Sequence, residues 1–100
     1  MVTHIVYFWL KDGLDDEQKN QFIEGAKSLL TIDSIAHGYV GVPASTEKRP
    51  IIDSSYDHAL ITIFETIEDH DDYQVHPVHD KFRELAHLWD RVQIYDSETI

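Results

Sequence analysis

The sequence contains no cysteine, and it has only one methionine, four glycines and three prolines among 100 residues. The absence of cysteine excludes disulfides, thiolate zinc sites and cysteine nucleophiles, and it favours a cytoplasmic protein. Basic residues are also scarce, since 8 lysines and arginines accompany 19 acidic residues, for a formal net charge of -11. Such a surface repels phosphate backbones and anionic lipids, so we expect neither a nucleic-acid partner nor a membrane partner.

Long hydrophobic runs are absent as well. The apolar stretch VTHIVYFWL near the N-terminus meets Lys11 and Asp12 too soon for a signal sequence or a membrane-spanning helix. A chain of 100 residues that is 42% hydrophobic is large enough for one hydrophobic core. We therefore predict a single globular domain over residues 1–100.

The order of apolar patterns predicts the fold class. Runs of β-branched and aromatic residues predict four strands, over 2–11, 34–43, 57–65 and 91–98. Apolar residues at helical spacing predict one helix over 15–31 and a second, broken helix between the last two strands. Its first piece begins at Thr66, and its second begins at His76 and Pro77 and carries an apolar stripe as far as Trp89. The order β-α-β-β-α-β is typical of a ferredoxin-like α+β sandwich with an antiparallel sheet.

The first strand is apolar on both faces. Val6 and Phe8 point to one side, whereas Ile5 and Tyr7 point to the other, and the third strand has the same character. Helices cover only one face of such a sheet, so the second face needs another partner. We predict a homodimer whose two sheets pack face to face.

The seven histidines of the sequence differ in how well their positions suit a functional site. His37, His70 and His87 lie in polar or off-stripe positions, so we expect them to be solvated. His4 and His58 interrupt apolar strand faces, where each is either a core histidine with a hydrogen-bond partner or a polar group of a pocket. If their strands are neighbours, the two imidazoles can share one face and form a polar pocket.

The stretch YQVHPVHD, residues 73 to 80, concentrates polar aromatic side chains at a helix start. Pro77 suits the first helical position and makes His76 the expected cap, while His79 lies one turn before Phe82 and can face the sheet. Tyr73 ends the preceding helical piece, where its ring can be core and its hydroxyl a polar tip. A neutral imidazole and a phenol in one apolar pocket can transfer a proton at a carbonyl and stabilise the oxyanion.

Metal binding is the competing interpretation of the same stretch. His76 and His79 are three residues apart, and carboxylates lie nearby at Asp71, Asp72 and Asp80. No further ligand follows at a recognisable spacing, so we expect no metal and no other cofactor.

Four segments carry a resemblance to a known family: THIVYFWLK, YDHALITIFET, DYQVHPVHDKF and VQIYD, which together span residues 3–96. The sequence resembles the stress-responsive α/β-barrel family, also called the dimeric α/β-barrel (Dabb) family. The resemblance implies ferredoxin-like subunits whose sheets join across a two-fold axis into a barrel. Many members of the family have no assigned activity, whereas some similar plant proteins are polyketide cyclases that perform an intramolecular aldol condensation.

The resemblance also implies roles for individual residues. Carried over by position, His79 would be the catalytic base and Tyr73 its partner, with His4 and His58 as the polar groups of the substrate pocket and His76 orienting or capping. All five of these positions carry the residue type that the cyclases use.

Two functions of different classes remain open. One is a small cofactor-independent enzyme that acts on an apolar carbonyl compound through His79 and Tyr73, and it requires a cavity that reaches His79. The other is a non-catalytic dimeric protein that binds a ligand or protects against stress, and in it His79 would be packed shut. Cofactor-independent monooxygenases are a third class built on small ferredoxin-like dimers, but none of their motifs is present.

Overall fold

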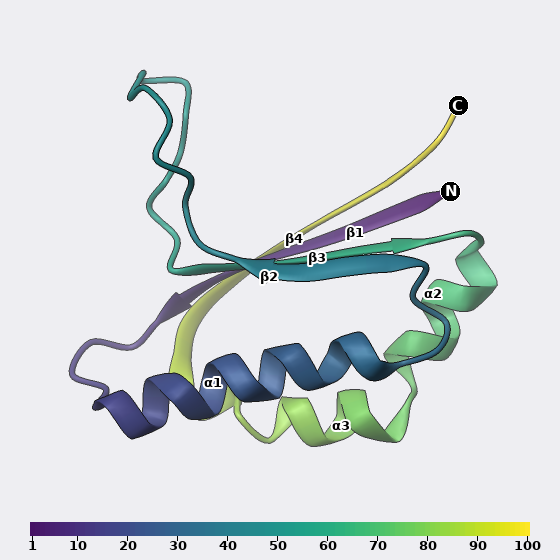
Figure 1. The fold of residues 1–100 in the computed structure, drawn as a ribbon, viewed down its shortest axis with the longest axis horizontal. Coiled ribbons are helices and arrows are strands. Elements are labelled where there is room, and N and C mark those ends of the chain that lie inside the picture. The colour runs from purple at the N-terminus through teal and green to yellow at the C-terminus, as the bar shows by residue number, and fades with distance from the viewer.

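The structure is a computed structural model that describes residues 1–100 and has the predicted order of elements (Figure 1). The strands are β1 (Val2–Leu10), β2 (His37–Gly41), β3 (His58–Phe64) and β4 (Trp89–Glu98). The helices are α1 (Asp16–Ser28), α2 (Ile67–Gln74) and α3 (Pro77–Arg83), with short 3-10 turns at Leu29–Thr31 and Ala86–Leu88. The prediction of a ferredoxin-like α+β fold is confirmed.

The four strands form one antiparallel sheet in the order β2-β3-β1-β4, and the helices lie on one face of it (Figure 1). β1 and β3 are the two central strands, and in their register His4 lies opposite Thr62 and Phe8 opposite His58. On the other side of β1, His4 pairs with Asp96 of β4. This register decides which of the predicted site residues can meet.

Local signals set the helix starts where the sequence predicts them. Asp15 caps α1 in a capping box, in which its carboxylate accepts from the backbone N–H of Gln18 at 2.8 Å. The hydroxyl of Thr66 accepts from the backbone N–H of Asp69 at 3.1 Å and begins α2. His76 and Pro77 begin α3 as cap and first residue.

The predicted helical stripe as far as Trp89 is wrong, because α3 ends at Arg83 and Trp89 is the first residue of β4. The apolar residues beyond Arg83 still reach the core, but they do so from a turn and a strand. Trp89 stacks on Phe82 with ring centroids 5.4 Å apart. A turn that closes over the end of a helix can therefore bring apolar residues to the core as a longer helix would, and the sequence pattern does not distinguish the two. The predicted strand over 34–43 is also shorter in the structure, where β2 spans His37–Gly41.

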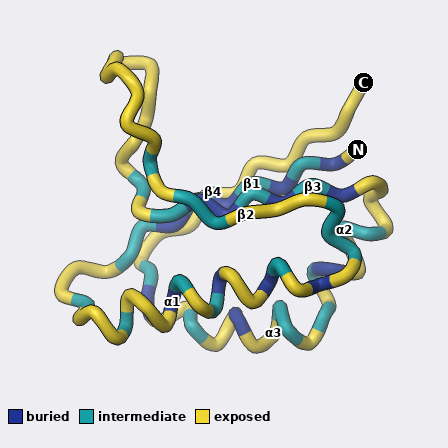
Figure 2. Tube along the Cα trace, in the orientation of Figure 1, coloured by how far each residue is buried: buried dark blue, intermediate teal, exposed yellow.

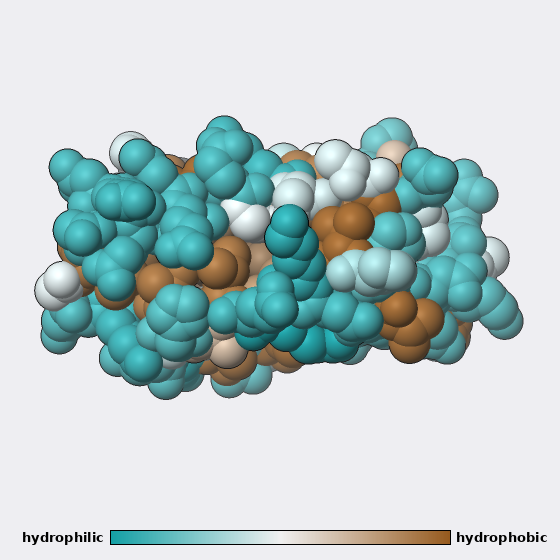
Figure 3. All heavy atoms as spheres, turned by 90° about the horizontal axis from the view of Figure 1, so that it is seen from below, coloured by the Kyte–Doolittle hydropathy of each residue, from teal (hydrophilic) through white to brown (hydrophobic).

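The hydrophobic core fills the space between the sheet and the helices (Figure 2). Phe22, Leu29, Phe64 and Leu88 have no exposed surface. Burial of each such side chain contributes about 1.5–3 kcal/mol to the free energy of unfolding. The face of the molecule seen from below in Figure 3 is mainly hydrophilic, with small apolar areas between the polar side chains.

The opposite face of the sheet has no helices on it. Ile5, Tyr7 and Trp9 of β1 are half-buried there, whereas Tyr39 and Tyr95 are each 61% exposed. The connection between β2 and β3, residues 42–57, projects on this side of the sheet (Figure 1). The apolar second face expected from the strand pattern is therefore present and open in the single chain. No helix of the structure is long and apolar enough to span a membrane.

Candidate functional site

The junction between α2 and α3 positions the tyrosine and histidines of the YQVHPVHD stretch. Tyr73 lies one residue before the end of α2 and has no exposed surface. Its ring contacts Phe64 of β3, with centroids 5.2 Å apart. Tyr73 is thus anchored in the core, and burial raises the pKa of its hydroxyl, although the positive charge of Arg83 opposes this. The phenol keeps its proton throughout the neutral range and can donate it in a hydrogen bond.

His76 and His79 have different positions, as the sequence predicts. The ring nitrogen Nδ1 of His76 accepts from the backbone N–H of Val78 at 3.1 Å, so this imidazole caps α3. His79 follows within the first turn of α3, and its ring meets that of Tyr73 at a centroid distance of 4.8 Å and an angle of 87°. Pro77 has no backbone N–H that needs a partner at the start of α3. The side chain of His76 therefore caps the next backbone N–H, that of Val78.

His79 holds an unsatisfied polar atom inside the protein. Its Nδ1 is buried and has no hydrogen-bond partner. Burial lowers the pKa of His79, and with the smaller effect of the positive charge of Arg83 it falls to about 4. The imidazole is therefore neutral at pH 7. A buried polar atom without a partner is uncommon in folded proteins, which marks His79 as more than a packed core residue.

A cavity of about 230 Å³ opens beside Tyr73 and His79, between α3 and the helix-covered face of β1 and β4. His4, Tyr73 and His79 all line it, together with Gln74 and Arg83. The remaining lining residues are apolar: Val6, Phe8, Leu29, Leu60, Phe82, Trp89, Val92 and Ile94. Such a mixture of apolar walls and a few convergent polar groups is typical of small-ligand sites.

His4 is almost completely buried, with 3% of its surface exposed. Its Nδ1 lies 2.5 Å from a carboxylate oxygen of Asp96 on the neighbouring strand. Burial lowers the pKa of His4, whereas the hydrogen bond and the negative charge of Asp96 raise it. The ring of His4 lies 6.0 Å from that of Tyr73, so the strand histidine does reach the cavity that the sequence predicts for it.

His58 lies elsewhere. It shares the helix-covered face of the sheet with His4, but the register places it opposite Phe8, four residues along β1 from His4. Its ring contacts Phe22 at a centroid distance of 5.2 Å, and it is absent from the walls of the cavity. Burial lowers the pKa of His58. The structure therefore does not join the imidazoles of His4 and His58 in one pocket.

The model of the stress-responsive A/B barrel domain family matches residues 2–99. The chain belongs to this family. The match covers both the strands that form the sheet and the α2–α3 junction that carries Tyr73 and His79.

The chain is similar to several characterised or solved proteins of this type. It is 26% identical over 97 residues to the olivetolic acid cyclase of Cannabis sativa, which covers 95% of this chain and 93% of the cyclase. It shares 25% identity and a TM-score of 0.72 with a dimeric ferredoxin-like protein of unknown function from Bacteroides fragilis, covering 98% and 95% of the two chains. The hydroxynitrile lyase of Passiflora edulis has the same fold, with a TM-score of 0.77 at 22% identity and coverage of 99% and 95%.

Three residues of this family member stand at the site although the sequence did not single them out for it. His70, which the sequence predicts to be solvated, is instead half-buried, and the centroid of its ring lies 4.9 Å from that of His4. Asp96 bonds to His4 from β4, and Arg83 lines the cavity from α3. Their contacts depend on the register of β1 with β4 and on how α2 meets the sheet. The spacing of residues within one segment of the sequence predicts neither of these.

The sequence offered a metal site at His76 and His79 as an alternative interpretation, and the structure does not bring such a group of ligands together. His76 uses its Nδ1 to cap α3, and no group of metal-ligating side chains forms around His76 and His79. The structure instead gathers His4, His70 and Asp96, whose ligand atoms lie within 4.8 Å of one another.

Proposed function

We propose that this protein is a small acid–base enzyme that acts on an apolar carbonyl compound, with His79 as the base and Tyr73 as the hydrogen-bond donor. The observation that carries the proposal is that His79, an imidazole held neutral by burial, lines a cavity of about 230 Å³ together with Tyr73. Its Nδ1 makes no hydrogen bond within the protein, whereas a purely structural histidine is normally bonded to a partner. The similarity to the olivetolic acid cyclase of Cannabis sativa supports the same class of reaction.

The proposed reaction starts with removal of a proton from the carbon next to a carbonyl group. The C–H bond breaks, His79 takes the proton, and the electron pair moves to the carbonyl oxygen to form an enolate. Tyr73 donates a hydrogen bond to this oxygen, and the positive charge of Arg83 in the same wall favours it. In a cyclisation, the enolate carbon then forms a bond to a second carbonyl carbon of the same molecule, and protonated His79 returns its proton to the new alkoxide.

The environment of His79 suits a base that works without help from a cofactor. Because its pKa is lowered to about 4, the imidazole is neutral and ready to accept a proton at any pH above about 5. The same shift makes it a weaker base than free imidazole, so the reaction depends on stabilisation of the enolate by Tyr73 and Arg83.

The size of the cavity limits the substrate. A volume of about 230 Å³ lies just below the range of about 300–1,000 Å³ that is usual for drug-sized ligands. Phe8 fills part of the space from β1, and Phe82 and Trp89 close it from α3 and β4. We therefore propose a compact carbonyl compound, such as a short polyketide or an aryl ketone, in preference to a long-chain substrate.

We also propose that the protein is a homodimer formed through the open face of the sheet. Ile5, Tyr7 and Ile61 lie on this face without a helix above them. The similar proteins from Bacteroides fragilis and Thermobifida fusca are described as dimeric ferredoxin-like proteins, which supports this arrangement. Pairing two such faces would remove their apolar side chains from water.

The test of the acid–base proposal is turnover of a panel of short β-polyketide thioesters and aryl β-diketones by the wild-type protein, His79→Ala and Tyr73→Phe. We expect His79→Ala to lose about 100-fold or more in rate and Tyr73→Phe to lose about tenfold or more. His87→Ala is the matched control, because His87 is exposed and bonds only to the backbone carbonyl of Glu84.

The pH profile separates the proposed base from other histidines. The rate should fall on the acid side near pH 4, where His79 becomes protonated, and not near pH 6.5. Binding of the same compounds without turnover, unchanged by His79→Ala, would favour the non-catalytic ligand-binding protein instead.

A further inference from the structure

A second cluster of ligating side chains lies beside the acid–base cavity, where α2 meets the ends of β1 and β4. It consists of His4 on β1, His70 on α2 and Asp96 on β4. Each residue offers one nitrogen or carboxylate oxygen, and these atoms lie within 4.8 Å of one another. The three residues come from three separate elements, so their closeness is not a consequence of neighbouring positions in one helix.

The first half of the cluster is the bond between His4 and Asp96. The imidazole of His4 is almost completely buried, whereas the Asp96 side chain is 53% exposed. A divalent ion can therefore approach the carboxylate from solvent, and binding between Asp96 and His4 would displace the proton that the two side chains share.

The second half is His70, whose ring is oriented by contacts at both of its nitrogens. Its Nδ1 lies 3.1 Å from a carboxylate oxygen of Asp71. The side-chain amide of Gln74 donates to the other nitrogen, Nε2, at 3.3 Å. Both contacts suit the tautomer with its proton on Nδ1, so Nε2 is unprotonated and its lone pair accepts from Gln74. Metal-binding histidines are commonly oriented by a carboxylate in the same way.

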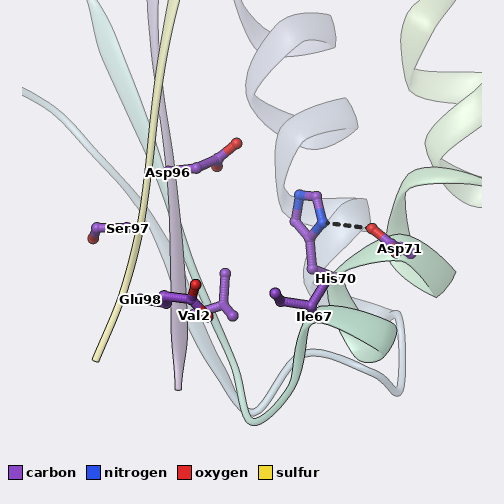
Figure 4. A pocket seen from close by; sticks show the side chains of 7 residues that line it. All are labelled: Val2, Ile67, His70, Asp71, Asp96, Ser97 and Glu98. Atoms are coloured by element: carbon purple, nitrogen blue, oxygen red, sulfur yellow. Dashed lines mark hydrogen bonds and ion pairs between the residues drawn. The ribbon is translucent and has the colours of Figure 1, made fainter. Parts of the chain in front are cut away.

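Figure 4 shows how His70, Asp71 and Asp96 lie around an open space. The Nδ1 of His70 faces Asp71, while the opposite side of the ring is turned toward Asp96 across the space. The cavity there has a volume of about 270 Å³, and three of its lining residues are the acids Asp71, Asp96 and Glu98. Together with the formal net charge of -11, this lining attracts cations to the cavity.

We propose that the His4–His70–Asp96 cluster binds one divalent transition-metal ion per chain, of the zinc class. Two imidazoles and one carboxylate match the ligands that zinc takes in three-ligand sites with an open fourth position, and they suit magnesium and calcium poorly because these ions prefer oxygen ligands. The Gln74 amide leaves Nε2 of His70 when the ion binds. Asp71 is a positioning residue that orients His70. The site shares His4 with the wall of the acid–base cavity, but it includes neither His79 nor Tyr73, and its test does not depend on the proposed acid–base chemistry.

The proposal is tested by titrating chelator-treated, full-length protein with Zn²⁺ in an isothermal calorimeter. We expect one ion per chain, and we expect His70→Ala to weaken the affinity by about 100-fold or more. Asp96→Asn should also weaken it, and Asp71→Ala should weaken it by about tenfold because only the orientation of His70 is lost. His87→Ala is the control and should leave the affinity unchanged, since His87 lies on the Ala86–Leu88 turn outside the cluster.

The result that would overturn the proposal is equal Zn²⁺ affinity in wild type, His70→Ala and His87→Ala, or no saturable binding by the wild-type protein at millimolar Zn²⁺. Circular dichroism of each variant shows whether it remains folded. Asp71→Ala provides an independent check, because Asp71 is exposed and does not touch the core. Neither His70 nor Asp71 takes part in the proposed acid–base reaction, so a failure here leaves that reaction to be judged by its own test.

Discussion

Lowering the pH from 7 to 5 should destabilise this protein through His79. In the folded protein burial lowers the pKa of His79 to about 4, whereas in the unfolded chain it returns to about 6.5. Between these values the unfolded chain binds a proton that the folded protein does not. The contribution of His79 to stability is therefore full above about pH 6.5, and it is lost progressively as the pH falls from about 6.5 to about 4.

The magnitude follows from the difference of about 2.5 between the two pKa values. At 1.36 kcal/mol per unit the full effect would be about 3.4 kcal/mol, of which about 1.8 kcal/mol falls between pH 7 and pH 5. The ring is half-buried, so solvent screening reduces the part between pH 7 and pH 5 to about 1 kcal/mol.

The assay compares urea unfolding of the wild-type protein and His79→Asn at pH 7 and pH 5, at one ionic strength and one low micromolar chain concentration. The other histidines titrate in both proteins, so the difference between the two isolates His79. We expect the wild type to lose about 1 kcal/mol more than His79→Asn as the pH falls. Equal losses, or a larger loss in His79→Asn, would refute the conclusion that His79 is held neutral by burial.

Three further predictions concern the sheet. Thr62→Val should cost about 1 kcal/mol of stability in urea unfolding, because the fully buried hydroxyl of Thr62 donates to the backbone oxygen of His4 at 2.8 Å; an unchanged midpoint would contradict this. Gly38→Ala should cost about 1–3 kcal/mol, because its Cβ would lie 3.0 Å from a backbone oxygen of β3, whereas Gly41→Ala, with no neighbour closer than 3.6 Å, should cost less than half as much in the same assay. Ile5→Lys places a charge on the open face and should convert the dimer to a monomer in sedimentation velocity; an unchanged sedimentation coefficient would count against the proposed interface.

Most of the fold follows from local patterns in the sequence. The run of β-branched and aromatic residues around Val6 predicts β1, and Thr66 and His76 predict where α2 and α3 begin. The end of α3 could not be predicted in this way. Phe82 and Trp89 are at helical spacing, yet a turn that brings Trp89 back over Phe82 buries both rings as well as a continuous helix would.

The candidate site could be predicted only in part, for a related physical reason. Tyr73 and His79 are close in sequence and joined by one helix junction, so their neighbourhood is local information. The contacts of His4 depend on the register of β1 with β4 and on the approach of α2, which sets it beside Asp96 and His70. Sequence alone shows a histidine on an apolar face and no more.

The most direct test of the acid–base proposal is proton exchange at a simple ketone, which requires no knowledge of the natural substrate. Acetophenone has one ring and one carbonyl group, a size suited to the cavity of about 230 Å³. Exchange of its methyl protons for deuterium in D₂O near neutral pH is followed by ¹H NMR with wild type, His79→Ala and Tyr73→Phe at equal concentration. The account predicts that the wild type exchanges these protons about 100-fold or more faster than His79→Ala, with Tyr73→Phe in between. Equal exchange rates for folded wild type and folded His79→Ala would contradict it.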